Sequence, residues 1–217
     1  MDFADRNVRP LLHLFSALRP RTTEVKLLIL LLVVMALVHL VYFIRVQELY
    51  PSYGLTTEQY YSPPAKNILH HGVYGFGYPP TIQETTYRPP LYSFVLAGAY
   101  WLFWEDEVIA LIVNNLACLG TIVVSYLIGS VFSRKIGLGA AFIYALDPAR
   151  LVASNTVEAG ALYGLLFPLF FLVTVRLFSR DPTRTRAIVS SLLLGMATLV
   201  RTASLYLWFP LLISLVL

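Results

Sequence analysis

The chain has 217 residues, of which 58% are hydrophobic and only 13% are charged. In a soluble domain about a quarter of the residues are charged, so this composition excludes an ordinary soluble protein and indicates a polytopic membrane protein. The net charge of +4 does not indicate a nucleic-acid partner, because the basic residues stand at the ends of apolar runs instead of gathering in one patch. We therefore expect an all-α, polytopic helical bundle in a lipid bilayer.

An N-terminal segment, residues 1–26, precedes the first apolar run. It is polar and carries five lysine and arginine side chains, which favours the cytoplasmic side. The run Leu27–Ile44 has 18 residues without a formal charge, and as a helix it nearly spans a hydrocarbon core of about 30 Å. It lies too far into the chain and is too long for a cleaved signal peptide. We interpret it as a signal anchor, and residues 27–217 as one transmembrane domain with the N-terminus in the cytoplasm.

A large loop, residues 45–87, follows this span and is expected on the extracytoplasmic side. Within it, Ser62 followed by Pro63 is typical of a helix start, with Ser62 as the N-cap, and Gly72 is typical of a helix end. The helix between them is short and amphipathic, and we expect its apolar face to lie on the bilayer surface. That face consists of Ala65, Ile68 and Leu69.

Nearly continuous apolar sequence follows the loop. If Leu91–Trp104 crossed the membrane fully, the basic pair Arg134-Lys135 would lie outside, against the positive-inside tendency. If this 14-residue block is re-entrant or interfacial, that pair and the arginines between Arg176 and Arg186 all return to the cytoplasm. Asp147 and Glu158 then lie on the same side as the outer loop. We expect a multi-pass protein of the plasma (inner) membrane.

Five segments, taken in chain order, carry a family resemblance. They read AKNILHHGVYG, YRPPLYSFVLAGAYWLF, FIYALDP, NTVEAGALYGLLFPLFFL and GMATLVRTASLYL. This set resembles the N-terminal part of the membrane-embedded GT-C glycosyltransferases, of the protein-mannosyltransferase and aminoarabinose-transferase type, from about Val25 onward. The resemblance implies a GT-C-like core and transfer of a sugar from a polyprenyl phosphate to an acceptor at the outer membrane face. A carboxylate would take the acceptor's proton, and a fixed cation or metal would stabilise the departing phosphate.

Two arginines match basic residues of that family. Arg88 stands in Arg88-Pro89-Pro90 and is expected to hold the donor phosphate through two parallel hydrogen bonds. Arg201 interrupts a later apolar run and matches the family's arginine there. The alternative for Arg88 is an interfacial arginine whose head lies among lipid headgroups.

The acidic residues match the family less well. Its catalytic acid stands eight residues before the helix alanine and four before a tyrosine, and counting back from Ala65, with Tyr61 as that tyrosine, gives Thr57. Threonine is not a base at its ordinary pKa, so the neighbouring Glu58 is the candidate catalytic base. Glu84, four residues before Arg88, is a second candidate.

Asp147 and Glu158 are candidates for a second acid at the site. Asp147 can equally end a helix before Pro148, and Glu158 can begin the next helix, where the helix dipole favours an anion. A carboxylate at membrane depth needs a partner, for which Arg150 and Arg201 are the nearest candidates.

The adjacent His70 and His71 are a further feature of the loop. On a helix they point about 100° apart, so they do not form a paired metal site of the His-x-x-x-His kind. One of them with a carboxylate could bind a divalent metal, and the sequence indicates no other cofactor.

Two functions stay open at this point. The ordered motifs favour a GT-C glycosyltransferase that uses a polyprenyl-phosphate sugar. Thr57 and the short chain favour a degenerate or truncated member, or a non-catalytic transmembrane scaffold subunit that packs against other membrane protein subunits.

Overall fold

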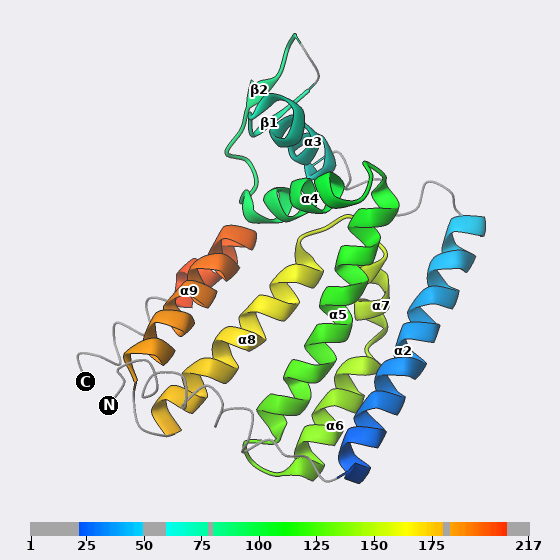
Figure 1. Cartoon of the computed structure of the whole chain (residues 1–217), viewed down its shortest axis with the longest axis vertical. Helices are drawn as coiled ribbons and strands as arrows, with labels where there is room; N and C mark the ends of the chain where they lie inside the picture. Colours follow the sequence, from blue (N-terminus) through cyan, green and yellow to red (C-terminus); the bar gives the residue numbers. More distant parts are fainter. Residues whose placement is uncertain (1–21, 50–59, 78–79, 180–182, 208–217) are drawn as a thin grey trace, which may run out of the picture.

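The structure is a computed structural model, and it describes residues 22–49, 60–77, 80–179 and 183–207. Within these ranges the chain forms eight α-helices, one 3-10 helix and a single pair of two-residue strands (Figure 1). The prediction of an all-α protein is therefore confirmed. Most of the N-terminal segment, together with Thr57 and Glu58, lies outside the described residues.

Two helices are long and apolar enough to cross a membrane. They are α2 (Thr22–Leu49), which contains the predicted span, and α5 (Glu107–Gly129). Helices α6 (Arg134–Ala145) and α7 (Pro148–Ser154) meet the same criterion as one pair bent by 60°. The described residues thus contain two candidate spans, or three if the bent pair is one span. The number of crossings and their direction stay predictions.

Helix α5 lies at the centre of the bundle. It packs against α6 on one side and α8 (Gly160–Ser179) on another, and α9 (Arg184–Val200) packs against α8 (Figure 1). The backbones of α5 and α6 approach closely at Gly129 and Gly137. A Cβ atom on Gly129 would lie only 2.8 Å from the Cα atom of Gly137, so a larger residue would not fit there. Small residues allow such backbone approach between apolar helices.

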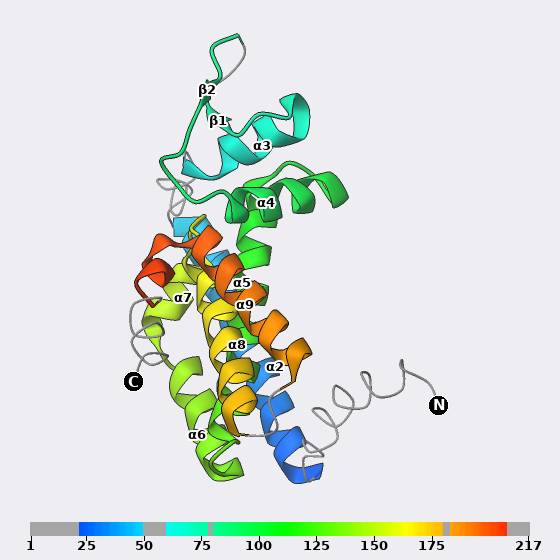
Figure 2. The ribbon, with the colours of Figure 1, turned by 90° about the vertical axis from the view of Figure 1, so that its left-hand side faces the viewer.

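A separate layer covers one end of this bundle. It consists of α3 (Ser62–His71), the antiparallel strands β1 (Gly75–Phe76) and β2 (Gln83–Glu84), and α4 (Leu91–Leu102). Helix α4 lies across the end of the bundle instead of along it (Figures 1 and 2). This orientation and its length of 12 residues agree with the interpretation of Leu91–Trp104 as a segment that does not cross the membrane.

The expectation that α3 rests on the bilayer is wrong. Ala65 is fully buried, and Ile68 and Leu69 pack against the same core cluster as Tyr92 and Leu96 of α4. The physical reason is that an amphipathic helix buries its apolar face against whichever apolar surface is nearest, and here α4 supplies that surface.

The boundaries of α3 follow the sequence signals with one correction. Gly72 ends the helix as predicted, with φ at +68° and its backbone N–H bonded to the Ile68 carbonyl at 3.1 Å. Ser62 is not the N-cap, because the helix begins at Ser62 itself and Tyr61 precedes it. The Ser62 hydroxyl instead donates to Glu107 Oε1 at 2.6 Å and lies 3.1 Å from the Tyr100 hydroxyl.

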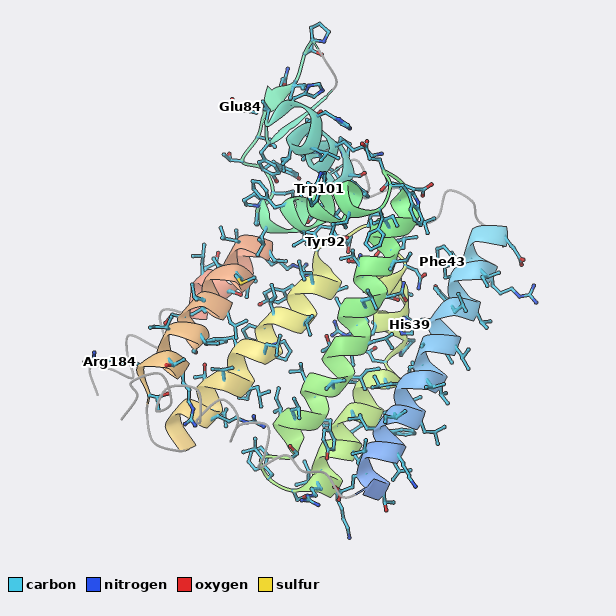
Figure 3. The ribbon with its side chains drawn as sticks, in the orientation of Figure 1. His39, Phe43, Glu84, Tyr92, Trp101 and Arg184 are labelled. Carbon is cyan, nitrogen blue, oxygen red and sulfur yellow. The ribbon has the colours of Figure 1, made fainter. Side chains whose placement is uncertain are left out.

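The opposite end of the bundle carries a second group of basic residues. Arg134 begins α6 and forms an ion pair at 3.3 Å with Glu24 in the first turn of α2. Arg176 lies in the last turn of α8, and Arg184 begins α9 at the same end (Figure 3). The basic residues that the charge pattern assigned to one side, Arg134, Arg176 and Arg184, thus lie at the end away from the α3–α4 layer. That the basic end faces the cytoplasm stays a prediction.

Candidate functional site

A cavity of about 550 Å³ lies where the α3–α4 layer meets the ends of α8 and α9. Five parts of the chain line it: the residues just before α3, Tyr74 between α3 and β1, the linker into α4, the turn before α8, and the end of α9 with the following 3-10 helix η2 (Thr202–Leu207). The charged residues among the described lining are Arg88, Glu158 and Arg201. All three were singled out from the sequence, and the structure brings them to one cavity.

Arg88 is held by its backbone and by two aromatic rings. Its Cζ atom lies 5.1 Å from the ring centroid of Tyr60 and 5.1 Å from that of Tyr87. Its carbonyl accepts a hydrogen bond of 2.9 Å from the Tyr74 hydroxyl. The Nε atom is buried, and no hydrogen-bond partner for it lies among the described residues.

Arg201 reaches the cavity from the end of α9. It follows the last helical residue, and its backbone N–H bonds to the Ala197 carbonyl at 2.9 Å. One of its guanidinium nitrogens lies 3.9 Å from the position that a Cβ atom on Gly160 would take. The Arg201 side chain therefore lies against the start of α8, two residues after Glu158.

Glu158 shares the cavity with both arginines, but it is paired with neither. In the described part of the chain, ion pairs are formed by Arg45, Lys66, His70, Arg134 and Arg150, whereas Arg88, Arg201 and Glu158 form none. The cavity thus presents two cations and one carboxylate whose charges are not neutralised by direct contact with other described residues. Arg201, one of the two candidate partners, lines the same cavity as Glu158 but does not form an ion pair with it.

Asn114 of α5 fixes the turn that carries Glu158. This side chain is fully buried, and its amide nitrogen donates to the carbonyls of Thr156 at 2.6 Å and Glu158 at 3.2 Å. Its amide oxygen accepts from the Tyr92 hydroxyl at 3.0 Å. Asn114 therefore ties α5, the turn before α8 and α4 together. The sequence offered only one signal for it, an amide pair, Asn114-Asn115, inside an apolar run.

Tyr61 adds a hydroxyl group to the cavity wall. The residue is 7% exposed, and its ring meets that of Tyr92 edge-on with centroids 5.0 Å apart. Burial raises the pKa of the Tyr61 hydroxyl, and the positive charge of Arg88 opposes this rise. Tyr61 is therefore a neutral hydrogen-bond donor at physiological pH.

A polar cluster around Glu107 fastens α3 to the rest of the site. Glu107 accepts from Ser62 at 2.6 Å, from Lys66 at 3.1 Å and from the Tyr100 hydroxyl at 3.2 Å. These bonds join α3, α4 and the start of α5. Because Tyr60 and Tyr61 immediately precede α3, the cluster also fixes the aromatic wall of the cavity.

Other residues singled out from the sequence lie elsewhere. Glu84 is exposed on β2 and is not among the described residues that line the cavity (Figure 3). Asp147 caps α7 by accepting from the Ala149 N–H at 3.0 Å, and it pairs with Arg150 at 3.1 Å. Arg150, one of the two candidate partners, thus pairs with Asp147, and Asp147 has the helix-boundary position that the sequence left open.

The two histidines of α3 also lie away from the described lining. His70 Nε2 is 2.7 Å from Glu105 Oε1, and His71 is exposed. No three His, Cys, Asp or Glu side chains of the described residues gather as metal ligands. A divalent metal stays a prediction.

A second buried polar cluster was not expected from the sequence. His39 of α2 is 5% exposed, and its Nδ1 atom lies 2.6 Å from Asn115 Oδ1 and 3.0 Å from the Ser154 hydroxyl (Figure 3). It connects α2 to α5 and α7, and thus holds the outermost helix to the bundle.

The chemistry of the cavity is that of an anion site beside an apolar surface. Arg88 and Arg201 offer charged N–H donors, and Tyr61 offers a hydroxyl. Leu199 and Leu205 line the same cavity and are each 49% exposed. Such a site suits an amphipathic anion with an oxygen-rich head and an apolar tail.

Comparisons of the chain with protein-family models, with curated proteins and with solved structures find no match.

Proposed function

We propose that this chain is a GT-C-like integral membrane protein that binds a polyprenyl-phosphate sugar and transfers the sugar to an acceptor at the outer membrane face. The observation that carries this proposal is the cavity in which Arg88, Arg201 and Glu158 meet without ion pairs. The order of motifs along the chain supports the same assignment.

The two arginines are suited to the phosphate of such a donor. A guanidinium binds phosphate oxygens through two parallel hydrogen bonds. At a separation of about 4 Å and an effective dielectric constant of about 20, each arginine–phosphate pair contributes roughly 4 kcal/mol before desolvation is subtracted. Because Arg88 and Arg201 have no carboxylate partner among the described residues, binding does not first have to break an ion pair.

The proposed reaction exchanges one bond at the sugar for another. The acceptor's nucleophilic atom forms a bond to the anomeric carbon while the bond from that carbon to the phosphate oxygen breaks. Glu158 takes the acceptor's proton, and the prenyl phosphate leaves with its charge stabilised by Arg88 and Arg201. We assign the proton to Glu158 in preference to Glu84, because Glu158 is the carboxylate that lines the described cavity.

We place the chain in the inner membrane. In the proposed orientation the N-terminus lies in the cytoplasm and the cavity lies on the outer side of that membrane. The first turns of α6 and α9, with Arg134 and Arg184, lie at the end of the bundle away from the α3–α4 layer (Figure 1), which supports this orientation through the positive-inside tendency. The end of α4 exposes four consecutive large apolar side chains, with exposed fractions between 57% and 73%. They are Trp101, Leu102, Phe103 and Trp104. Aromatic residues of this kind concentrate at membrane interfaces.

The test uses the full chain, purified into lipid nanodiscs and supplied with a labelled pool of polyprenyl-phosphate sugars. We expect Arg88→Ala and Arg201→Ala to abolish donor binding, and Glu158→Gln to retain binding and lose sugar release. Arg45→Ala is the matched control, because Arg45 is an exposed arginine paired with Glu48 outside the cavity. Wild-type donor binding by both cavity arginine variants would refute the proposal. Glu58→Gln, made in parallel, reports on the candidate base that lies outside the described residues.

Thr57 favours a second candidate function, a non-catalytic scaffold subunit of a larger membrane complex. It stands where the family resemblance calls for the catalytic acid. The same purification distinguishes the two functions. Stoichiometric recovery with other membrane subunits and no consumption of the labelled donor would favour the scaffold.

A further inference from the structure

Arg88 differs from most arginines that lie near a carboxylate. Arg45, Arg134 and Arg150 each form an ion pair with a nearby acid. Arg88 shares its cavity with Glu158 and forms no ion pair with any described residue. An ion pair with Glu158 would occupy two of its N–H donors and neutralise its charge, so the side chain would be less available to an anionic ligand. Some other contact must therefore hold the guanidinium in place.

The rings of Tyr60 and Tyr87 supply that contact. Each ring centroid lies 5.1 Å from the Arg88 Cζ atom, and the two centroids are 6.0 Å apart with the ring planes tilted by 39°. These three distances describe a notch formed by two rings, with the guanidinium over both. The face of an aromatic ring attracts a cation without accepting its N–H groups. The two tyrosines therefore stabilise the charge of Arg88 and leave its donors available.

The notch itself is fixed by neighbouring contacts. The ring of Tyr60 meets Phe76 of β1 edge-on, with centroids 6.5 Å apart. The backbone N–H of Tyr87 donates to the Thr85 hydroxyl at 3.0 Å. The Tyr74 hydroxyl holds the Arg88 carbonyl. The position of the guanidinium is thus set from two segments, one before α3 and one before α4.

The described residues accept no hydrogen bond from one donor of Arg88. This donor, the Nε–H, is buried and so closed to solvent, and the N–H groups left for a ligand are those of the two terminal nitrogens. We propose that Tyr60 and Tyr87 are positioning residues, which hold Arg88 by their ring faces so that its N–H donors are kept for the phosphate of the ligand. This inference rests on the proposed function of the cavity, and it assigns to these tyrosines a role that the family resemblance does not.

The experiment measures binding of a defined probe, tritiated farnesyl monophosphate, to the full chain in phosphatidylcholine nanodiscs. Farnesol, which has the same tail without the phosphate, corrects for partition into the lipid. The variants are Tyr60→Leu, Tyr87→Leu and the double variant, each paired with the corresponding phenylalanine variant. Arg88→Ala tests the anion site itself. Tyr206→Leu is the matched control, because Tyr206 is 75% exposed on η2 and does not line the described cavity.

The ring faces predict a specific pattern of dissociation constants. Each leucine variant should weaken binding of the prenyl phosphate about two- to fivefold, and the double variant about tenfold, given the usual strength of exposed cation–π contacts. The phenylalanine variants should bind within about twofold of wild type, because they keep the ring and remove only the hydroxyl. A loss that reflected general unfolding would appear in farnesol partition and in the melting temperature as well.

The outcomes distinguish the positioning role of the two tyrosines from the proposed binding of phosphate in the cavity. If Arg88→Ala loses binding and both leucine variants bind like wild type, the notch has no role and the anion site stands. If the phenylalanine variants lose as much as the leucine variants, the hydroxyl groups act instead of the ring faces, and the inference is overturned. If Arg88→Ala binds like wild type, or wild type prefers farnesol, the proposed function fails and the inference fails with it.

Discussion

Replacing Asn114 by leucine tests how the bundle holds Glu158 in the cavity. The two side chains have similar volumes, so the change removes hydrogen bonds without opening a large void. Three polar groups lose their Asn114 partner: the Tyr92 hydroxyl, the Thr156 carbonyl and the Glu158 carbonyl. We expect Asn114→Leu to fold with reduced stability and to release the turn that carries Glu158.

The magnitude follows from the burial of each group. Tyr92 is fully buried, so its hydroxyl bears the full cost of an unsatisfied donor, about 1–3 kcal/mol. Residues Thr156 and Glu158 are not fully buried, so water can partly replace the hydrogen bonds that their carbonyls lose. Their two bonds together contribute about 1 kcal/mol, in line with average hydrogen bonds between membrane helices. The free energy of unfolding should therefore fall by about 2–4 kcal/mol.

The assay is equilibrium unfolding of the full chain in detergent micelles, followed by circular dichroism. The informative control is Asn114→Leu combined with Tyr92→Phe, which removes the stranded hydroxyl as well as its acceptor. The double variant should recover the share of the loss that belongs to Tyr92, about 1–3 kcal/mol. An unchanged stability of Asn114→Leu, or a double variant no more stable than the single one, would refute this reasoning.

Three further predictions concern the site and its surroundings. Glu158→Gln should bind a prenyl phosphate within about threefold of wild type and lose sugar transfer about 100-fold or more, measured as product release, because only the proton acceptor is removed; an equal loss of binding would contradict that role. In a Trp208→Phe background, the fluorescence of Trp101 and Trp104 should be quenched by lipids brominated near the glycerol backbone, whereas quenching by aqueous iodide alone would contradict an interfacial α4. Burial raises the pKa of Tyr61, so the unfolded chain releases this proton first and stability should fall as the pH rises above about 10. Tyr61→Phe should reduce that slope in alkaline unfolding curves, and an unchanged slope would count against a buried hydroxyl.

Local features of the fold were predictable because each depends on a few adjacent residues. The length of the apolar run in α2 gives a membrane-length helix, and Gly72 ends α3 because glycine adopts the left-handed backbone conformation without strain. The apolar face of α3 was assigned to the bilayer surface instead of to α4, because that contact depends on residues distant in the sequence. The sequence shows that a helix has an apolar face, but it does not show that Tyr92 and Leu96 lie against that face.

The residues of the site were predictable one at a time but not as a group. Arg88, Glu158 and Arg201 attract attention because an ionised side chain next to apolar sequence needs a reason to be there. Their meeting depends on the pairing of α8 with α9 and on the layer formed by α3 and α4, neither of which has a local signal. Asn114 has no such signal either, because its hydroxyl partner, Tyr92, belongs to another helix.

Glu158 and Arg201 each lie at a helix end whose dipole favours their charge. Glu158 stands two residues before α8 and therefore near the positive end of that helix dipole. Arg201 follows α9 and lies at its negative end. Each charge is stabilised by about 0.3–1 kcal/mol by its own helix.

Among the described residues, Arg88 is stabilised by two aromatic rings and not by an acid. Three different local interactions thus hold three charges in one cavity without neutralising them. Arg150 and Asp147, by contrast, form an ion pair elsewhere in this chain. The proposed function accounts for the difference, because an anionic ligand would supply the counter-charge that Arg88 and Arg201 lack among the described residues.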